Sequence, residues 1–231
     1  MRKLIVGLAV LAVILGVGWF ADNLIRSTTE SRLASQLAAG LGAPAGAATV
    51  KLGGNPFALW YLTHSVPNAA ITVSSFPVEV NAATVTLTNL QCTTGGLVVT
   101  DSDVIAQSVS GTVQVSYDEL SRVSGLRVSD GGDGWLKAQF STSFLGQSIR
   151  GNIVARPRVD PGTHKLSLEG AQLWVAEWKL GPDKLDQVSD VVAGLLDLAL
   201  PYGLDLVGFQ PGADGVTLGF TAETMTVPID Q

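Results

Sequence analysis

Ala69–Leu87 reads AAITVSSFPVEVNAATVTL, a stretch in which aliphatic side chains recur at every second position. The aliphatic pairs at 71 and 73, 78 and 80, and 85 and 87 are interleaved with Thr, Ser, Glu and Asn. Side chains of a strand point to alternate faces of its sheet, so this period of two predicts strands with one apolar face. The stretch therefore favours a β-rich fold whose strands bury one side only.

The same pattern extends on both sides of this stretch. Strands are predicted at 48–52, 97–100, 109–115, 126–129, 135–144, 148–158, 165–168, 172–178, 203–209, 215–221 and 225–227. Residues typical of turns separate many of them, as at Asp130–Gly134, Leu145–Gln147, Asp160–Gly162 and Gln210–Asp214. Strands of about eight to twelve residues joined by tight turns indicate an antiparallel, curved sheet with two or three helices packed against it. The predicted fold class is α+β.

Helical patterns interrupt the strands in a few places. Asp22–Leu41 is amphipathic, Tyr117–Ser124 (YDELSRVS) ends at Gly125, and Asp183–Leu200 is apolar along one face and stops at Pro201. Glycine after the last turn and proline beyond it are ordinary helix stops. These segments predict the helices that pack on the sheet.

The first of these helices carries leucine at 33, 37 and 41, so that its apolar residues form one stripe. Gly40 and Gly42 are expected to end the helix, and an Ala/Gly/Pro linker continues to Ala48. The stripe either packs on the folded domain or lies on a bilayer. We expect it to pack on the domain.

Leu4–Ala21 contains no charged residue, and Arg2 and Lys3 precede it. A helix of that length spans about 27 Å at about 1.5 Å per residue, close to the roughly 30 Å of a bilayer's hydrocarbon core. Basic residues stay on the cytoplasmic side, so the rest of the chain is expected outside the plasma membrane. The predicted organisation is a transmembrane signal-anchor over 1–21, an amphipathic helix and linker over 22–48, and one domain over 49–231.

Secretion after removal of a signal peptide is the alternative to this single-pass anchor. Cleavage after Ala21 would place the bulky Trp19 at a position where signal peptidases require a small residue. The uncleaved anchor is therefore the preferred interpretation.

The net charge is −6, and the linear sequence contains no basic cluster. This balance argues against nucleic acid as a partner and against electrostatic docking to anionic lipid headgroups. Cys92 is the single cysteine, so an internal disulfide is impossible, and we expect it to be a buried small apolar residue. Protein partners are not indicated.

Residues that catalyse reactions are scarce. His64 and His164 lie a hundred positions apart with no metal-ligand partner at strand or helix spacing, and no G-x-S-x-G motif occurs. Asp101 with Asp103, and Asp130 with Asp133, are better explained as turn residues than as calcium ligands. The pattern predicts neither an enzyme nor a bound cofactor or metal.

Three local patterns together resemble a known family. They are Val50–Leu62 (a strand, a Gly-Gly turn and a Pro-Phe helix), Val113–Leu120 (VQVSYDEL), and Leu200–Leu204 (LPYGL) followed by Gly215-Val216. With the apolar N-terminus, they resemble the LmeA-type phospholipid-binding proteins of the actinobacterial cell envelope, from about Thr49 to Val227. Asn55 departs from the pattern, where an apolar residue is expected.

The resemblance implies a tubular, lipid-transfer-like fold: a long, strongly curved antiparallel sheet wrapped around one or two helices, with an interior that accepts acyl chains. Family members are associated with maintaining envelope lipids or lipoglycans. It implies a membrane-anchored, extracytoplasmic protein that holds or transfers phospholipid and interacts with the plasma membrane. A non-catalytic envelope scaffold and, less favoured, an envelope lipid or glycan hydrolase are the alternatives.

Candidate lipid-binding residues follow from this hypothesis. We expect the lining to come from the helix at 183–200 and from apolar sheet faces, and a membrane-contacting lip to come from the apolar segment at 55–62. The lining candidates are Val73, Val85, Leu87, Val113, Val115, Leu195, Leu204 and Leu206, and the lip candidates are Phe57, Leu59, Trp60 and Tyr61. The competing interpretation is that these side chains simply fill a core.

Overall fold

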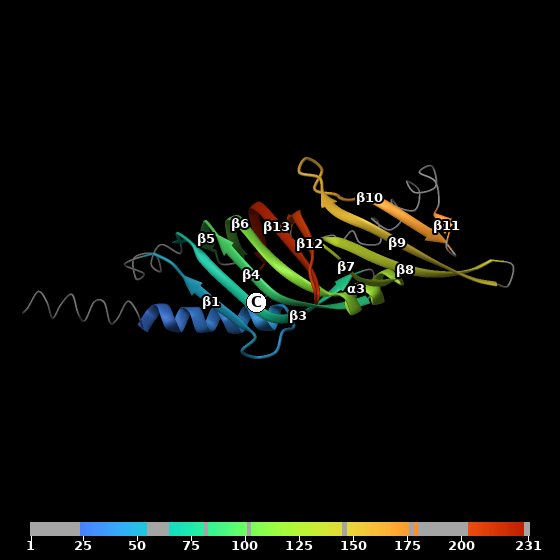
Figure 1. Cartoon of the computed structure of the whole chain (residues 1–231). Coiled ribbons are helices and arrows are strands. Elements are labelled where there is room, and N and C mark those ends of the chain that lie inside the picture. Colours follow the sequence, from blue (N-terminus) through green and yellow to red (C-terminus); the bar gives the residue numbers. More distant parts are fainter. Residues whose placement is uncertain are drawn as a thin grey trace, which may run out of the picture.

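The computed structural model describes residues 24–54, 65–80, 83–100, 103–144, 147–175, 178–179 and 203–228. Within them the chain forms a helix over 24–40, a short helix α3 (Tyr117–Ser124) and two antiparallel sheets (Figure 1). The strands are β1 (Ala48–Leu52), β2 (Ser65–Val66), β3 (Ala69–Val80), β4 (Ala83–Thr94), β5 (Gly96–Val99), β6 (Asp103–Ser116), β7 (Arg127–Gly132), β8 (Trp135–Phe144), β9 (Gln147–Val159), β10 (Leu166–Val175), β11 (Trp178–Lys179), β12 (Asp205–Pro211) and β13 (Gly215–Pro228).

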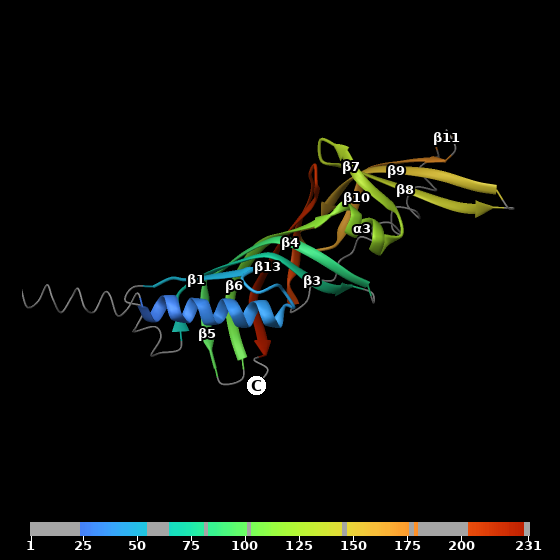
Figure 2. The same ribbon diagram turned by 90° about the horizontal axis from the view of Figure 1, so that it is seen from below.

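The first sheet has the strand order β1-β3-β4-β6-β13-β12, with β5 pairing β6 and β2 pairing β5. The second sheet has the order β11-β10-β9-β8-β7. The two sheets lie end to end in an elongated arrangement, with helix 24–40 along the first sheet and the β8–β9 hairpin at the opposite end (Figures 1 and 2). The predicted α+β class and antiparallel pairing are confirmed.

Alternation of apolar and polar residues determines which face of each strand is buried. In β1 the residues Ala48, Val50 and Leu52 are buried while the two between them are exposed. Most buried residues of both sheets belong to one main cluster, which joins Leu218 of the first sheet to Ile153 and Leu173 of the second. Val50 and Leu52 belong to a smaller cluster with Val66, Ala69 and Leu97 of the first sheet. The two sheets therefore share a main core.

Helix 24–40 packs on the first sheet through Leu33, Leu37 and Leu41, as predicted, whereas Ile25 stays 36% exposed. Its end is a Schellman motif, in which Ala43 N–H donates to the Ala38 carbonyl and Gly42 N–H donates to the Ala39 carbonyl. Gly42 has φ +63°, a conformation that glycine adopts without steric cost. The predicted linker forms a defined turn closed by a bond from Ala47 N–H to the Pro44 carbonyl.

The same helix protects an edge of the first sheet. β1 is an edge strand, and the Leu52 N–H donates to Glu30 Oε1 at 2.7 Å. Arg26 reaches past the end of β1 and donates to the Gly54 carbonyl. Unpaired edges promote association with other chains, so these two side chains stabilise β1 as a terminal strand.

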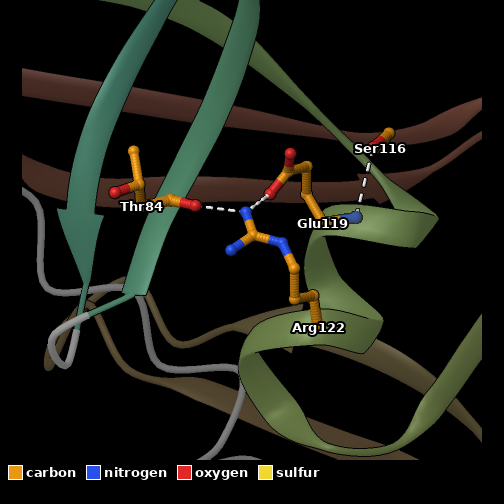
Figure 3. Close-up of polar contacts among 4 residues, drawn as sticks. All are labelled: Thr84, Ser116, Glu119 and Arg122. Atoms are coloured by element: carbon orange, nitrogen blue, oxygen red, sulfur yellow. Dashed lines mark hydrogen bonds and ion pairs between the residues drawn. The ribbon is translucent and has the colours of Figure 1, made fainter.

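The helix α3 matches the predicted bounds, Tyr117–Ser124, and connects the two sheets. Ser116 caps it by accepting from Glu119 N–H at 3.3 Å, and Gly125 ends it in the left-handed conformation. Arg122 pairs with Glu119 and donates to the Thr84 carbonyl of β4 (Figure 3). These contacts fix the position of α3 against the first sheet just before β7 begins the second.

The strands differ from the sequence prediction in two respects. First, the prediction of one long sheet was wrong, because the strands form two sheets. The helix α3 and Gly125 redirect the chain between β6 and β7, and β7–β11 form the second sheet. Segments predicted as separate strands are continuous, because β3 runs through Pro77 beyond the part that β1 covers and β10 accommodates a bulge near Gly170.

Some predicted elements lie outside the described residues. These are the anchor at 4–21, the apolar segment at 55–62 and the helix at 183–200. In the part of the chain that the structure describes, no helix combines the length and the hydropathy needed to cross a bilayer.

Gly111 tests the packing at the centre of the first sheet. A Cβ on this residue would lie 2.4 Å from the Gln91 carbonyl oxygen and 2.5 Å from Cζ of Phe220. We expect Gly111→Ala to lower the free energy of unfolding by about 2 kcal/mol, because the neighbouring backbone cannot move aside freely. Chemical denaturation measures this change.

Gly40→Ala is the matched control, since nothing lies within 4 Å of the added Cβ and the residue is helical. It should leave the free energy of unfolding unchanged or raise it by about 0.5–1 kcal/mol. Equal stability of the two variants would contradict the observed packing around Gly111.

Candidate functional site

The predicted sheet-lining residues lie together on the inner face of the first sheet. Val73, Val85, Val113, Val115 and Leu206 are buried members of the shared cluster. Two further candidates, at 87 and 204, are partly buried and pack against it. The sheet therefore brings together side chains from strands that are more than a hundred residues apart in the sequence.

Strand register explains how these residues meet. Leu87 of β4 lies opposite Val115 of β6, which lies opposite Val216 of β13. Directly opposite residues in an antiparallel sheet have neighbouring side chains on the same face. These three residues form an apolar row across β4, β6 and β13 near the start of α3, and Val216 is fully buried (0% exposed).

A second row shows lining residues that the sequence analysis missed. Cys92 of β4 lies opposite Gly111 of β6, Gly111 opposite Phe220 of β13, and Phe220 opposite Leu206 of β12. Gly111 leaves room for the Phe220 ring, which would otherwise overlap a Cβ. The alternation of β13 (Val216, Leu218, Phe220 and Ala222) was the available signal for these residues.

The second sheet continues the apolar face. Its buried residues Leu136, Ile153, Ala155 and Leu173 belong to the same cluster as the first sheet's. The strands β6 and β13 have 14 residues each, which corresponds to about 46 Å at about 3.3 Å per residue. The apolar face is therefore long in comparison with a single helix or a compact pocket.

Polar groups are nearly absent from this interior. Among the described residues, the buried polar side chains are Thr94 and Ser124. Thr94 Oγ1 accepts from Ala69 N–H at 3.2 Å, and Ser124 Oγ donates to the Leu120 carbonyl at 2.7 Å. Both hydroxyls are bonded to the backbone, so in this part of the chain the face offers mainly apolar contact.

The residues considered for chemistry serve turns instead. Asp160 Oδ1 accepts from the backbone N–H and hydroxyl of Thr163 and from Gly162 N–H, and these bonds lower the pKa of Asp160. Asp130 Oδ1 accepts from Gly132 N–H in the β7–β8 turn. His164 Nδ1 lies 3.3 Å from the Leu206 carbonyl oxygen. No group of three potential metal ligands occurs among the described residues.

Tyr117 is another ionisable side chain with an altered pKa. Partial burial raises the pKa of Tyr117, and the nearby carboxylate of Asp130 acts in the same direction. Its hydroxyl donates to the Gly212 carbonyl at 2.7 Å, which joins the start of α3 to the β12–β13 turn. The contact is structural.

A shallow hollow of about 590 Å³ lies on helix 24–40, lined by Ser27, Thr28, Ser31, Arg32, Ser35 and Gln36. Its lining side chains are hydroxyl, amide and guanidinium groups, which do not match an acyl chain. The apolar inner face is the better candidate. The lip candidates Phe57, Leu59, Trp60 and Tyr61, and the lining candidate Leu195, lie outside the described residues.

A family model described as LmeA-like phospholipid-binding matches residues 20–221, which is most of the chain. The chain belongs to this LmeA-like family. Searches of curated proteins and of solved structures find no significant match.

The LmeA-like family is defined by binding phospholipid and is not a known enzyme family. Binding of a phospholipid requires an apolar surface for its acyl chains. The long apolar face shared by the two sheets has this character. Phospholipid is the ligand class that the family supports.

The reactivity of the Cys92 thiol measures how well the inner face is shielded from solvent. Burial raises the pKa of the Cys92 thiol from 9.0 to about 11. The thiolate is the form that alkylating agents attack, so at pH 8.5 its fraction is about a hundredfold lower than for an ordinary thiol. We expect iodoacetamide to label folded Cys92 about a hundredfold more slowly than the denatured protein, as measured by mass spectrometry.

Thr93→Cys in a Cys92→Ala background provides the control, because residue 93 is the exposed neighbour on the opposite face. It should be labelled at the rate of an ordinary thiol. Equal labelling of residues 92 and 93 would contradict this assignment of faces.

The same pKa shift predicts a dependence of stability on pH. Since the folded thiol has the higher pKa, Cys92 contributes stability below pH 9 that is lost as the pH rises from 9 to about 11.

Proposed function

We propose that this protein binds phospholipid by holding its acyl chains along the apolar face shared by the two sheets. The main observation in support is the continuity of that face, because one cluster joins both sheets. Among the described residues, the buried hydroxyls of Thr94 and Ser124 are bonded to the backbone. Membership of the LmeA-like family supports phospholipid as the ligand.

The energy of lipid transfer explains why such a face suits the task. Each methylene contributes about 0.8 kcal/mol, so two sixteen-carbon chains carry about 25 kcal/mol of transfer free energy out of water. A protein competes with a bilayer only if its own surface is almost as dry and apolar. Transfer between the two is then nearly balanced and can proceed in either direction.

Burial of the lining indicates how acyl chains would be accommodated. Val73, Val85, Val113 and Val115 are shielded by neighbouring side chains. Chains that contact these residues must displace the side chains that cover them. Leu87 is partly buried beside this group, and we propose that acyl chains enter next to it.

The cellular setting completes the proposal. The apolar Leu4–Ala21 would anchor the protein in the plasma membrane with its folded domain outside, and the aromatic segment containing Trp60 would form the lip through which lipid passes. Together these features describe a carrier or holder of phospholipid for maintenance of the cell envelope.

Photo-crosslinking of the full chain tests the proposal. A phospholipid with a diazirine in its acyl chain is incorporated into vesicles carrying the protein, and crosslinked peptides are identified by mass spectrometry. We expect crosslinks on inner-face residues of β4, β6 and β13. Crosslinks confined to residues 1–21 would show that lipid surrounds the anchor only. That result would favour a scaffold whose folded domain binds no lipid.

Leu87→Trp and Thr86→Trp form a matched pair on β4, because Leu87 faces the inner side and Thr86 the solvent. The indole at 87 would occupy space that acyl chains need, so crosslinking to the inner face should fall several-fold. The same change at 86 should leave it unaltered. Thermal unfolding checks that both variants are folded, and equal crosslinking of two folded variants would contradict the proposed site.

A further inference from the structure

The outer face of the second sheet carries a set of basic side chains, which we term the basic face: Arg127, Lys137, Arg150, Arg156 and Arg158. They come from β7, β8 and β9, strands that lie side by side at the end of the molecule away from helix 24–40 (Figures 1 and 2). The linear sequence shows no basic cluster because 31 positions separate the first of these residues from the last. Strand pairing creates the cluster.

Burial along the strands places these residues on one side. In β9 the residues Ile153 and Ala155 are buried, while Arg150, Arg156 and Arg158 are exposed. In β8 the residues on either side of Lys137 are buried, so Lys137 faces outward as well. The basic side chains therefore share the face opposite the apolar interior.

Register brings further side chains of suitable type onto this face. Arg127 lies opposite Gln139, Gln139 opposite Asn152, and Asn152 opposite Trp174, which is 39% exposed. The guanidinium of Arg156 lies 5.3 Å from the centre of the Trp135 ring. Indole rings favour the interface between water and lipid, where an apolar ring and a polar N–H are both accommodated.

Acidic residues only partly offset this charge. Glu169 of β10 lies on the same face and pairs with Arg158 at 2.8 Å, with both side chains exposed. Asp130, Asp133 and Asp160 belong to the β7–β8 and β9–β10 turns at one end of the sheet. Arg156 donates to the backbone carbonyl of Asp133, a contact that leaves its charge intact. A basic surface remains in a chain whose net charge is −6.

We propose that the basic face docks on an anionic lipid bilayer. The inference rests on the proposed function, because a protein that exchanges phospholipid must meet a membrane surface. Anionic headgroups attract arginine and lysine, and the indoles of Trp135 and Trp174 suit the headgroup region. The inner face then holds acyl chains while the outer face of the second sheet contacts the bilayer that supplies or receives them.

Vesicle capture tests this docking. Full-chain protein is reconstituted in phosphatidylcholine vesicles fixed to beads, and fluorescent vesicles of phosphatidylglycerol or of phosphatidylcholine are added. We expect capture of the phosphatidylglycerol vesicles alone, decreasing as salt rises from 0.05 to about 0.5 M, because salt screens the attraction. Capture that is indifferent to lipid charge would overturn the proposal.

Arg127→Gln with Arg150→Gln removes two charges from the basic face, and both side chains are exposed. Since each basic residue near an anionic surface contributes about fivefold in binding, removing two should weaken capture by about 25-fold. Arg32→Gln with Lys51→Gln is the control, because it removes the same charge from exposed positions associated with the first sheet. Equal loss in the two double variants would reject a localised docking surface.

Two further outcomes separate the possible failures. If the protein yields inner-face lipid crosslinks but captures no anionic vesicles, the docking inference is disproved and the proposed function stands. If it captures vesicles but yields no inner-face crosslinks, the proposed function is disproved and docking on anionic lipid stands. Binding of a single-stranded DNA oligonucleotide that depends on Arg127 and Arg150, without vesicle capture, would assign the face to a nucleic acid and overturn the lipid proposal.

Discussion

The structure depends on the burial of one apolar face on nearly every strand. A strand with alternating side chains has one face that water solvates and one that must be covered. In this chain most of the covered faces of both sheets meet in one main cluster, from Val73 in β3 to Leu173 in β10. Neither sheet is therefore an independent layer. At their junction α3 contacts β4 and the β12–β13 turn of the first sheet, and Ser121 Oγ of α3 accepts from Val128 N–H of β7 in the second.

A dry interior of this length restricts where polar groups can lie. Helix 24–40 supplies side chains to the free edge of β1, through Glu30 and Arg26, while its leucine stripe packs on the core. Thr94 and Ser124 are buried with their hydroxyls bonded to backbone. Unpaired polar groups in such an interior would be costly, and the same dryness makes the face compatible with acyl chains.

Local patterns predicted much of the fold, whereas long-range pairing could not be predicted. The bounds of α3 and β8 follow from a capping serine, a stopping glycine and strict alternation, all contained within a few residues. The division into two sheets depends on which strands pair across long stretches of sequence. The continuity of β3 through Pro77 depends on pairing with β4, since Pro77 lies opposite Thr86 and beyond the part of β3 that β1 covers. For the candidate site, the valines at 73, 85, 113 and 115 were identified from alternation, but the row through Cys92, Gly111 and Phe220 required the register.

The net charge of the whole chain does not show where charged side chains gather, for the same reason. A chain of net charge −6 without a run of basic residues suggests no attraction to anionic surfaces, yet charge acts over about a Debye length and not over sequence distance. Antiparallel pairing sets Arg127, Lys137 and Arg156 on adjacent strands of one sheet, facing away from the core. The alternation that creates an apolar interior necessarily creates an outer face as well. In the second sheet that outer face is basic and bears indole rings, so the pattern that produces a lipid-compatible inside also produces a surface suited to a membrane.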